Sequence, residues 1–471
     1  MFQSSALLGF AAASYLFAGV NAFGVQSYPN MFFGPSNVVK NDWFQGIDSR
    51  WAREMSEYWA DQLIETGPWS VTNKSYTAKS GDKKDYLSWA VYHWPDCSDV
   101  GNTTELTDEE VYDQCTYVTR DGQINPDTQL VHDNDALQNM SNSIYLSALA
   151  YLHTGDSKYA THINTALDTF FVNNATRMNP NLNYAQVVRG PGDQLGKHTG
   201  VLDLACMAKI ASGVSVMREL EPTEWDQATD DGVASWASDQ LEWLTTNELG
   251  IGEKNSTNNH GTFYVNQECA LHIILNDTQS CADALNEFYS TGPFPNQIDA
   301  NGDQPLESAR TRPYHYRAYN LMALVTNAQM GDFVGLSPSA WERTTSSNAT
   351  LTDALTYAMA QNYTDSGEEG QIKMLNPVVA AVASKYGDDD GTYAAYLKQT
   401  DPYFPGQPYF ALNKGLSDAG IKQGLLETTY GSVPAQPTVG SGDPDDLIHR
   451  RKREWKPRGT GWPSAVPTPA P

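Results

Sequence analysis

LQNMSNSIYLSALAYL, residues 137–152, is followed by HTGD, residues 153–156, and then by YATHINTALDTFF, residues 159–171. In both long stretches apolar residues recur at the spacing of one face of a helix. The Gly and Asp between them are typical of a turn. This part of the chain therefore predicts a hairpin of two helices, which is the unit from which the fold class follows.

Similar helical stretches occur on both sides of this hairpin. They are expected at Trp43–Thr66, Gly200–Leu220, Trp225–Leu244, Tyr264–Leu275, Ala282–Tyr289, Tyr314–Gln329, Leu351–Tyr363 and Val378–Tyr386. Gly, Pro, Asn and Asp mark the connections, and no alternating, strand-rich block of comparable length interrupts the series. The sequence thus predicts an all-α fold, an array of helical hairpins that is closed into a toroid or stacked.

The two ends of the chain differ from this helical region. Residues 1–22 are apolar and end in Val20-Asn21-Ala22, an A-x-A-like cleavage site, which predicts a signal peptide. We expect one helical domain over residues 23–432. Residues 433–471 are rich in Pro and Gly and carry a basic cluster, which predicts a disordered tail. Within it, Lys452-Arg453 is either a dibasic processing site or part of a solvated charge run.

Other features point to the secretory route. No later apolar run is long enough to span a bilayer, so a membrane partner is not expected and the mature chain should be secreted and extracellular. Sequons of the form N-x-S/T agree with this prediction. They begin at Asn73, Asn102, Asn139, Asn174, Asn255, Asn276, Asn348 and Asn362.

The chain has five cysteines, and the odd count leaves one thiol over. We expect disulfides in the two short-range pairs, Cys97–Cys115 and Cys269–Cys281. Cys206 lies in an apolar helical stretch and is expected to be a buried free thiol. A zinc site is not expected, because the sequence contains no C-x-x-C or H-x-x-x-H spacing.

The charge of the chain restricts its partners. The formal net charge is −26, which argues against a nucleic-acid partner. Acidity suits a secreted protein that works at low pH, but it also repels anionic ligands. If the substrate is acidic, a cleft must therefore gather Arg, Lys and His locally.

Asn258-Asn259-His260 is the first candidate site, at the point where a loop becomes a helix. Two amides and an imidazole, together with the free N–H groups and positive dipole of a helix N-terminus, can grip an anion. The alternative is that Asn258 is a simple helix N-cap beside an incidental histidine.

A Gly-rich loop is the second candidate site. It holds Tyr184, Gln186, Arg189 and His198 just before a predicted helix. An aromatic, irregular segment precedes it, and Trp94 of this segment can stack on a sugar ring. For Trp89, in the same segment, burial in the core is the more favoured interpretation.

The third candidate site is the stretch from Asp299 to Arg317. It begins like a calcium loop, D-x-N-x-D, but Arg310 stands where an EF-hand needs a bidentate Glu, so no metal is expected. What remains is a cationic and phenolic set made of Arg310, Arg312, His315, Tyr316 and Arg317. Such a set can focus an anionic ligand, whereas each member alone would be an ordinary surface ion pair.

Amides, Arg, His and Tyr without a metal favour elimination across C4–C5 of a uronic acid. The enzyme must neutralise the carboxylate so that charge developing in the transition state is stabilised. A base removes the C5 proton and an acid protonates the leaving O4. We expect nearby Arg to lower the pKa of a Tyr, so that Tyr316 alone can serve both roles for mannuronate or glucuronate. Guluronate would need a second group, such as His260.

Several motifs also carry a family resemblance. They are YHWPD (92–96), DGQINP (121–126), TRMNPNLNYAQ (176–186), NNH (258–260) and LESARTR (306–312) followed by His315-Tyr316. With these motifs in this order, the chain resembles the alginate-lyase-domain polysaccharide lyases, the superfamily that contains families 5 and 38. The resemblance implies an (α/α) toroid or incomplete barrel and a metal-independent elimination on a 4-linked polyuronate.

The resemblance also implies roles for single residues. Asn259 and His260 match the carboxylate-neutralising pair of the family, Arg310 matches its Arg, and Tyr316 matches its catalytic Tyr. Arg310 lies one residue closer to Tyr316 than in the family 5 pattern, so Arg312 can share or take the Arg role. The Trp and Asn-Pro loops are closer to the family 38-like members, for which glucuronan is expected as a substrate as well as alginate.

We therefore expect a secreted lyase that acts on an anionic polysaccharide, as a monomer and without a cofactor. Its expected substrate-binding residues are Asn258, Tyr184, Gln186, Arg189, His198, Arg312, His315 and Trp94, with His198 as a second candidate base. Two alternatives stay open, a glycoside hydrolase on a similar helical toroid, which needs two carboxylates, and a non-catalytic carbohydrate-binding protein.

Overall fold

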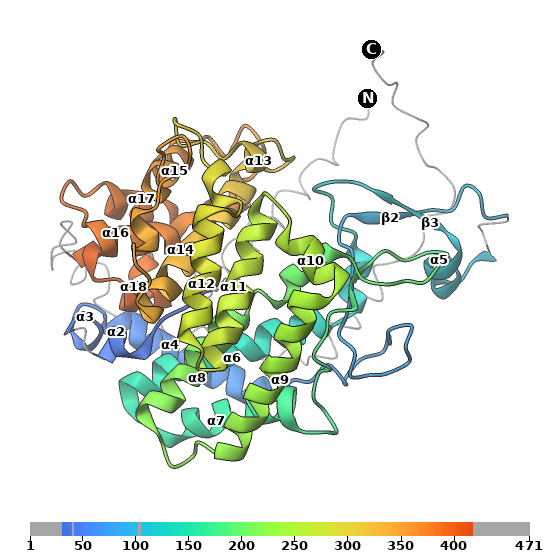
Figure 1. Ribbon diagram of the computed structural model, residues 1–471, viewed down its shortest axis with the longest axis horizontal. Helices are drawn as coiled ribbons and strands as arrows, with labels where there is room; N and C mark the ends of the chain where they lie inside the picture. Colours follow the sequence, from blue (N-terminus) through green and yellow to red (C-terminus); the bar gives the residue numbers. More distant parts are fainter. Residues whose placement is uncertain (1–30, 40–41, 102–104, 418–471) are drawn as a thin grey trace, which may run out of the picture. The chain divides into compact units, whose positions relative to one another are not determined.

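A computed structural model describes residues 31–39, 42–101 and 105–417 of the chain (Figure 1). Contacts divide the chain into a unit of residues 1–420, which holds all of these residues, and a unit of residues 421–471. The predicted signal peptide, 1–22, and the predicted tail, 433–471, lie outside the described residues.

Helices make up most of the described fold. The longer ones are α4 (Arg50–Thr66), α6 (Asp133–Thr154), α7 (Ser157–Leu167), α8 (Met207–Leu220), α9 (Gln227–Thr246), α11 (Asn259–Ile274), α12 (Thr278–Ser290), α14 (Pro313–Val334) and α16 (Asn376–Tyr386). The shorter ones are α2 (Pro35–Val39), α3 (Asp42–Gln45), α5 (Asp108–Gln114), α10 (Glu248–Lys254), α13 (Pro305–Ser308), α15 (Leu351–Met359), α17 (Thr392–Thr400) and α18 (Pro408–Leu412).

These helices pack against helices next to them in the sequence and against helices that are distant in the sequence. Helix α6 packs on α4, α7 and α8, and helix α11 packs on α8, α12 and α14. The same arrangement of hairpins is visible in Figure 1. The predicted all-α, toroid-type array of helical hairpins is confirmed.

The hairpin of α6 and α7 forms where the sequence predicts it. Gly155 ends α6 with a φ of 65°, in the left-handed region that glycine adopts at little cost. Asp156 then caps α7, because its side chain accepts the backbone N–H of Lys158 at 2.9 Å. Beyond Leu167 the helix continues as the π-helical turn η4 (Asp168–Val172).

One prediction about apolar runs is wrong. His198–Leu220, which comprises the turn η5 (His198–Leu204) and α8, is long and apolar enough to cross a membrane by length and composition. However, 89% of its most apolar window is buried inside the fold. The sequence signal therefore comes from a helix in the middle of the hairpin array, which is apolar all round because neighbours cover it.

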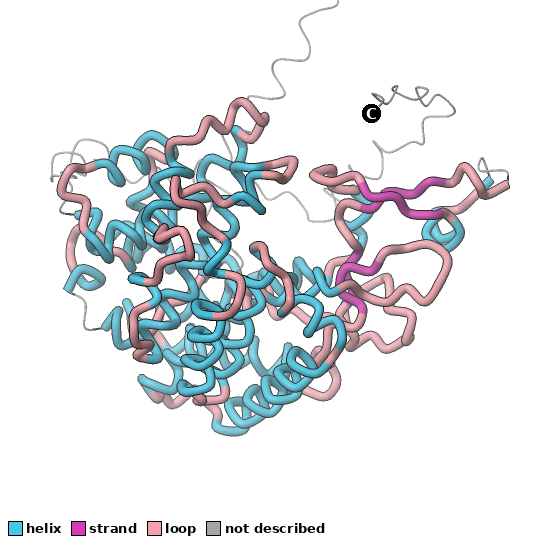
Figure 2. Tube along the Cα trace, turned by 45° about the horizontal axis from the view of Figure 1, so that its top comes forward, coloured by secondary structure: helices cyan, strands magenta, loops and turns pink. Residues whose placement is uncertain are grey.

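A small β layer accompanies the helices. Strand β1 (Leu87–Trp89) pairs in parallel with β4 (Tyr184–Val187), and β2 (His93–Asp96) pairs antiparallel with β3 (Thr116–Thr119). Figure 2 shows these strands gathered beside the helices. Each strand has only three or four residues, which is too short for an alternating pattern to be detected in the sequence.

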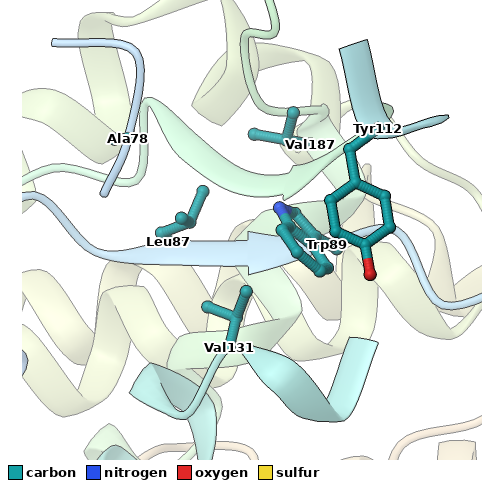
Figure 3. Close-up of a cluster of buried hydrophobic side chains, with 6 residues drawn as sticks. All are labelled: Ala78, Leu87, Trp89, Tyr112, Val131 and Val187. Atoms are coloured by element: carbon teal, nitrogen blue, oxygen red, sulfur yellow. The ribbon is translucent and has the colours of Figure 1, made fainter. Parts of the chain in front are cut away.

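An aromatic core holds this layer together (Figure 3). Its buried residues are Ala78, Leu87, Trp89, Tyr112, Val131 and Val187. The rings of Trp89 and Tyr112 lie 5.2 Å apart between centroids. The interpretation of Trp89 as a core residue is confirmed.

The cysteines follow the predicted pairing. Cys97–Cys115 links the end of β2 to the residue before β3, and Cys269–Cys281 links α11 to α12. Cys206 is free and buried. All three predictions are confirmed.

Candidate active site

A cleft of about 430 Å³ lies where the β layer meets the helices. Its lining from the layer comprises Ala90, Val91, Tyr92, His93 and Thr119, and its lining from α6 comprises Asn134 and Gln138. Strand β4, the loop after it and the turn η5 contribute Gln186, Lys197, Thr199, Leu202 and Asp203. The starts of α11 and α14 and the residues before α14 contribute Asn259, His260, Arg310, His315, Tyr316 and Tyr319.

Two phenols meet at one side of this cleft. The Oη atoms of Tyr316 and Tyr92 lie 2.9 Å apart, in hydrogen-bond contact. Arg310 donates from Nη2 to Tyr316 Oη at 2.9 Å, and its guanidinium lies 4.0 Å from the centroid of the Tyr316 ring. Arg312 donates from Nη2 to Tyr92 Oη at 2.7 Å. Each phenol oxygen thus has one arginine donor.

The expected lowering of the Tyr316 pKa is wrong for this structure. Burial, followed by the hydrogen bond and charge of Tyr92, raises the pKa of Tyr316 above its ordinary value, and Arg310 and Arg312 only partly oppose this. The sequence shows that two arginines lie near Tyr316, but it does not show how deeply the phenol is buried. The two arginines do lower the pKa of Tyr316, but burial raises it by more.

Asp121 holds Arg310 in place from the β layer side. Its Oδ1 accepts a hydrogen bond from Arg310 Nη2 at 3.0 Å, and its Oδ2 accepts one from the hydroxyl of Thr311 at 3.1 Å. A charge-assisted bond of this kind restricts the guanidinium more than a neutral one would. The arginine therefore approaches Tyr316 from a fixed position.

The start of α11 orients the amide of Asn259. Asn258 is the N-cap, and its Oδ1 accepts the backbone N–H of His260 at 3.3 Å. Asn259 donates from its backbone N and from Nδ2 to the two carboxylate oxygens of Glu307, at 2.7 and 2.6 Å. Glu307 is buried, and burial raises its pKa. Because Nδ2 carries two hydrogens, one remains for a ligand.

His260 and His198 share one acceptor. Glu253 of α10 accepts hydrogen bonds from His260 Nδ1 at 2.6 Å and from His198 Nδ1 at 2.7 Å. The hydrogen bond to Glu253 raises the pKa of His198 above its ordinary value, although burial opposes it. The two rings lie 6.3 Å apart between centroids. His260 lines the cleft, and so do Lys197 and Thr199, the neighbours of His198.

A second group of polar side chains in the cleft lining surrounds Asp203. Asp203 accepts hydrogen bonds from Tyr86 Oη at 3.0 Å and from Gln186 Nε2 at 3.1 Å. Gln186 also accepts a bond from Thr199 Oγ1 at 2.9 Å, and its backbone φ is 53°. A non-glycine residue in this region stores strain, which marks a side chain held by its surroundings.

His315 lines the cleft as a neutral group. Burial, followed by the charge of Arg312, lowers the pKa of His315 to about 4. Its ring stacks on Tyr319 with centroids 5.7 Å apart. The imidazole is therefore uncharged near neutral pH, and it can offer a hydrogen bond or packing surface but not a positive charge.

Six residues from the predicted substrate-binding set are not in the lining of this cleft; they are Asn258, Tyr184, Arg189, His198, Arg312 and Trp94. Three of them make contacts elsewhere in the β layer. The guanidinium of Arg189 is buried, lies 4.0 Å from the ring of Trp89 and faces Asp127 at 3.5 Å. Tyr184 packs against the aromatic core of the β layer. Trp94 donates from Nε1 to the backbone oxygen of Gln123 at 2.9 Å, and Arg120 covers its ring.

The structure also brings in residues to which the sequence assigned no role. They are Tyr92, Asp121, Asp203, Glu253 and Glu307. Tyr92, Asp121 and Glu307 stand inside the motifs YHWPD, DGQINP and LESARTR, so the motifs were the signal that could have identified them. Glu253 has no such signal. Within the described part of the chain, no cluster of three or more His, Cys, Asp or Glu side chains is placed to hold a metal ion.

Comparisons with known proteins add to this geometry. The family model described as Alginate lyase matches residues 70–369. The crystal structure of an alginate lyase from Bacteroides ovatus is similar, with a TM-score of 0.69, 23% identity, and coverage of 80% of this chain and 96% of that chain. Alginate lyase A1-III from Sphingomonas species A1 gives a TM-score of 0.41, 15% identity, and coverage of 70% and 86%. Comparison with curated proteins found no match.

Proposed function

Since this chain belongs to the alginate lyase family and is thus a polysaccharide lyase acting on an anionic polysaccharide, we propose that it cleaves a 4-linked polyuronate by metal-independent β-elimination. The proposed substrates are glucuronan or mannuronate-type alginate. The strongest support comes from one cleft that is lined by Tyr316, Arg310, His260 and Asn259 together. These are the groups that an elimination beside a carboxylate needs.

Neutralising the uronate carboxylate is the first requirement. The C5 proton becomes acidic enough to remove only when charge that spreads onto the carboxylate is stabilised. Asn259 offers the second hydrogen of Nδ2, and His260 offers Nε2, because its Nδ1 is engaged with Glu253. Arg310 supplies the positive charge nearest to Tyr316. We assign these three residues to the carboxylate.

The proton transfers are assigned to Tyr316. As a phenolate it takes the C5 proton, the C4–O4 bond breaks while the C4–C5 double bond forms, and the same phenol then returns the proton to O4. A phenolate at Tyr316 has two donors, Arg310 Nη2 and the hydroxyl of Tyr92, both 2.9 Å away. The bond and the charge of Arg310 favour the phenolate and partly oppose the effect of burial, which raises the pKa of Tyr316.

The alternatives fit this site less well. A glycoside hydrolase needs two carboxylates that flank the scissile bond. Among the described residues that line the cleft, Asp203 is the only carboxylate, and its oxygens accept hydrogen bonds from Tyr86, Ser88 and Gln186. Membership in a lyase family also argues against a binding protein without catalysis.

The test is a panel of glucuronan, polymannuronate and polyguluronate, each digested and read for ultraviolet absorbance and for new reducing ends. We expect the first or second polymer to give absorbance from a 4,5-unsaturated product. We expect Tyr316→Phe to lower kcat by about 10³-fold while the protein stays folded, since it removes both base and acid. Reducing ends that appear without absorbance would overturn the elimination.

We also propose that the protein is secreted and monomeric. Two disulfides are typical of an oxidising compartment. Several sequon asparagines have exposed side chains, as glycosylation requires; they are Asn73, Asn174, Asn255, Asn276, Asn348 and Asn362. Expression in a eukaryotic secretory host, with the mature N-terminus and glycans read by mass spectrometry, tests this proposal. Sizing by light scattering tests the oligomeric state.

A further inference from the structure

One carboxylate beside the cleft is held by two histidines. The side chain of Glu253 is fully buried, and its two oxygens accept hydrogen bonds from His260 Nδ1 and His198 Nδ1 at 2.6 and 2.7 Å. Among the described residues, no other side chain donates to it. Because a buried carboxylate is costly without partners, these two imidazoles are what stabilise its burial.

The backbone is built for this close approach. Gly252 precedes Glu253, and a Cβ at Gly252 would lie 3.1 Å from the Cβ of His198. Gly261 follows His260, and a Cβ at Gly261 would lie 2.2 Å from the backbone oxygen of Ser256. Glycine at both positions lets η5 and the first turn of α11 come close to α10. Both histidines can therefore reach the same carboxylate.

The contact determines which ring nitrogen of each histidine carries hydrogen. An ionised carboxylate only accepts, so Nδ1 of both rings must be protonated. Nε2 of each ring is then left for other partners. His260 lines the cleft beside Asn259. His198 is about half exposed, with 47% of its side chain accessible, and it lies between two cleft residues, Lys197 and Thr199.

We propose that Glu253 is a positioning residue that joins His260 and His198 into one imidazole pair, whose two protons set the affinity for the uronate carboxylate. With one carboxylate and two imidazoles, the unit carries a net charge of +1, 0 or −1 as its two protons leave. The doubly protonated unit attracts a carboxylate, and the others do so less. This inference rests on the proposed function.

Other charged or titratable groups face this unit and must be counted with it. Lys197 precedes η5 and opposes protonation of His198. Glu307 of α13 interacts with the charge of His260, and Tyr319 of α14 interacts with Glu253. The hydrogen bonds from both histidines lower the pKa of Glu253 although burial would raise it. The lowered pKa keeps the Glu253 carboxylate ionised.

Nitrogen-15 NMR of the full protein with labelled histidine tests the tautomers without any assay of activity. We expect His198 and His260, assigned with His198→Gln and His260→Gln, to be protonated at Nδ1 and bare at Nε2 once neutral. Finding either ring with its hydrogen on Nε2 would overturn the inference. Because this readout needs no substrate, it remains valid if the wild-type protein proves to have no lyase activity.

Kinetics of Glu253→Gln test the role in binding. A Gln can accept from one Nδ1–H, but its amide must donate to the other ring and forces the wrong tautomer there. We expect KM to rise by about 10-fold at pH 7, the rise of KM with pH to begin about one pH unit lower, and kcat to change much less. A KM profile like that of the wild type would overturn the inference.

Asp388→Asn is the matched control, because Asp388 is also a buried carboxylate, accepts the backbone N–H groups of Tyr393 and Ala394, and does not line the cleft. Its kinetic profile should match that of the wild type.

If Glu253→Gln does not fold, His198→Gln replaces it, because this variant removes one of the two titrating protons and keeps the hydrogen bond between His260 and Glu253. The dependence of KM on pH for His198→Gln should then lose one of its two titration steps. An unchanged dependence would overturn the proposal that His198 and His260 act as one pair.

Discussion

At the residue scale, the hydrogen bond between Tyr316 Oη and Tyr92 Oη is the centre of the candidate active site, because each oxygen also accepts a hydrogen bond from an arginine. The two arginines are not equivalent. Arg310 also pairs with Asp121 and stacks on the Tyr316 ring, whereas Arg312 has a buried Nε without a hydrogen-bond partner among the described residues. We therefore expect substitutions of Arg310 and of Arg312 to lower the catalytic rate by different amounts.

We predict that Arg310→Lys lowers kcat by about 100-fold, because it removes a fixed donor from the oxygen that becomes a phenolate. Arg312→Lys should lower kcat by only about 10-fold, since the hydrogen bond of Arg312 at 2.7 Å goes to Tyr92 and its guanidinium lies farther from the Tyr316 ring than that of Arg310 does. Steady-state rates on the best polyuronate measure both variants. The opposite ranking would assign the catalytic arginine role to Arg312.

The sequence could predict the parts of the site that lie in contiguous motifs. Asn259, His260, Arg310 and Tyr316 each lie within a few residues of a helix start, so local pattern could single them out, and the family resemblance joined them into one site. The pairing of Glu253 with two histidines depends on the approach of three separate elements, which no local pattern encodes. The sequence placed Arg189 in a Gly-rich loop before a helix, but it could not show that the guanidinium packs on the buried ring of Trp89.

At the element scale, helical periodicity found the hairpins and missed the β layer. The hairpin of α6 and α7 carries its own turn signal in Gly155 and Asp156. The strands β1 to β4 carry almost none, because each has only three or four residues. The element that positions Tyr92 and His93 is thus the one that sequence reasoning could not predict.

Helix α7 contains a histidine that predicts acid sensitivity. Burial lowers the pKa of His162 to about 4, and its Nε2 has no hydrogen-bond partner among the described residues. The unfolded chain therefore binds this proton at higher pH than the folded chain. Stability from the neutral ring is complete above about pH 6.5 and is lost as pH falls towards 4, by about 3 kcal/mol at pH 4.

We predict that His162→Phe removes this part of the acid dependence. Urea unfolding at a series of pH values should show a smaller loss of unfolding free energy between pH 6.5 and 4 for the variant than for the wild type. Equal losses in both proteins would mean that the pKa of His162 is the same in the folded and the unfolded chain.

At the scale of the whole molecule, a net charge of −26 opposes an anionic polymer while the cleft attracts it. The two effects have different ranges. Repulsion by the whole chain acts over about 30 Å at 0.01 M salt and over about 8 Å at 0.15 M. Contacts with Arg310 and His260 act at hydrogen-bond distance and are screened less.

We therefore predict that kcat/KM rises severalfold as salt increases from about 0.01 M to 0.15 M, and falls again towards 1 M. Initial rates of product absorbance at low substrate concentration measure it. A monotonic fall across the whole range would mean that the local field of the cleft dominates at every distance.

The hydrogen bond between Tyr92 and Tyr316 joins residues that are 224 positions apart, one in the β layer and one in α14. The reacting group and its donor thus come from two different parts of the sequence and of the fold. If the β layer loosens on mild heating, catalysis should stop while the helical circular-dichroism signal remains intact. Enzyme activity would then report the first local opening of this protein, well before its global unfolding.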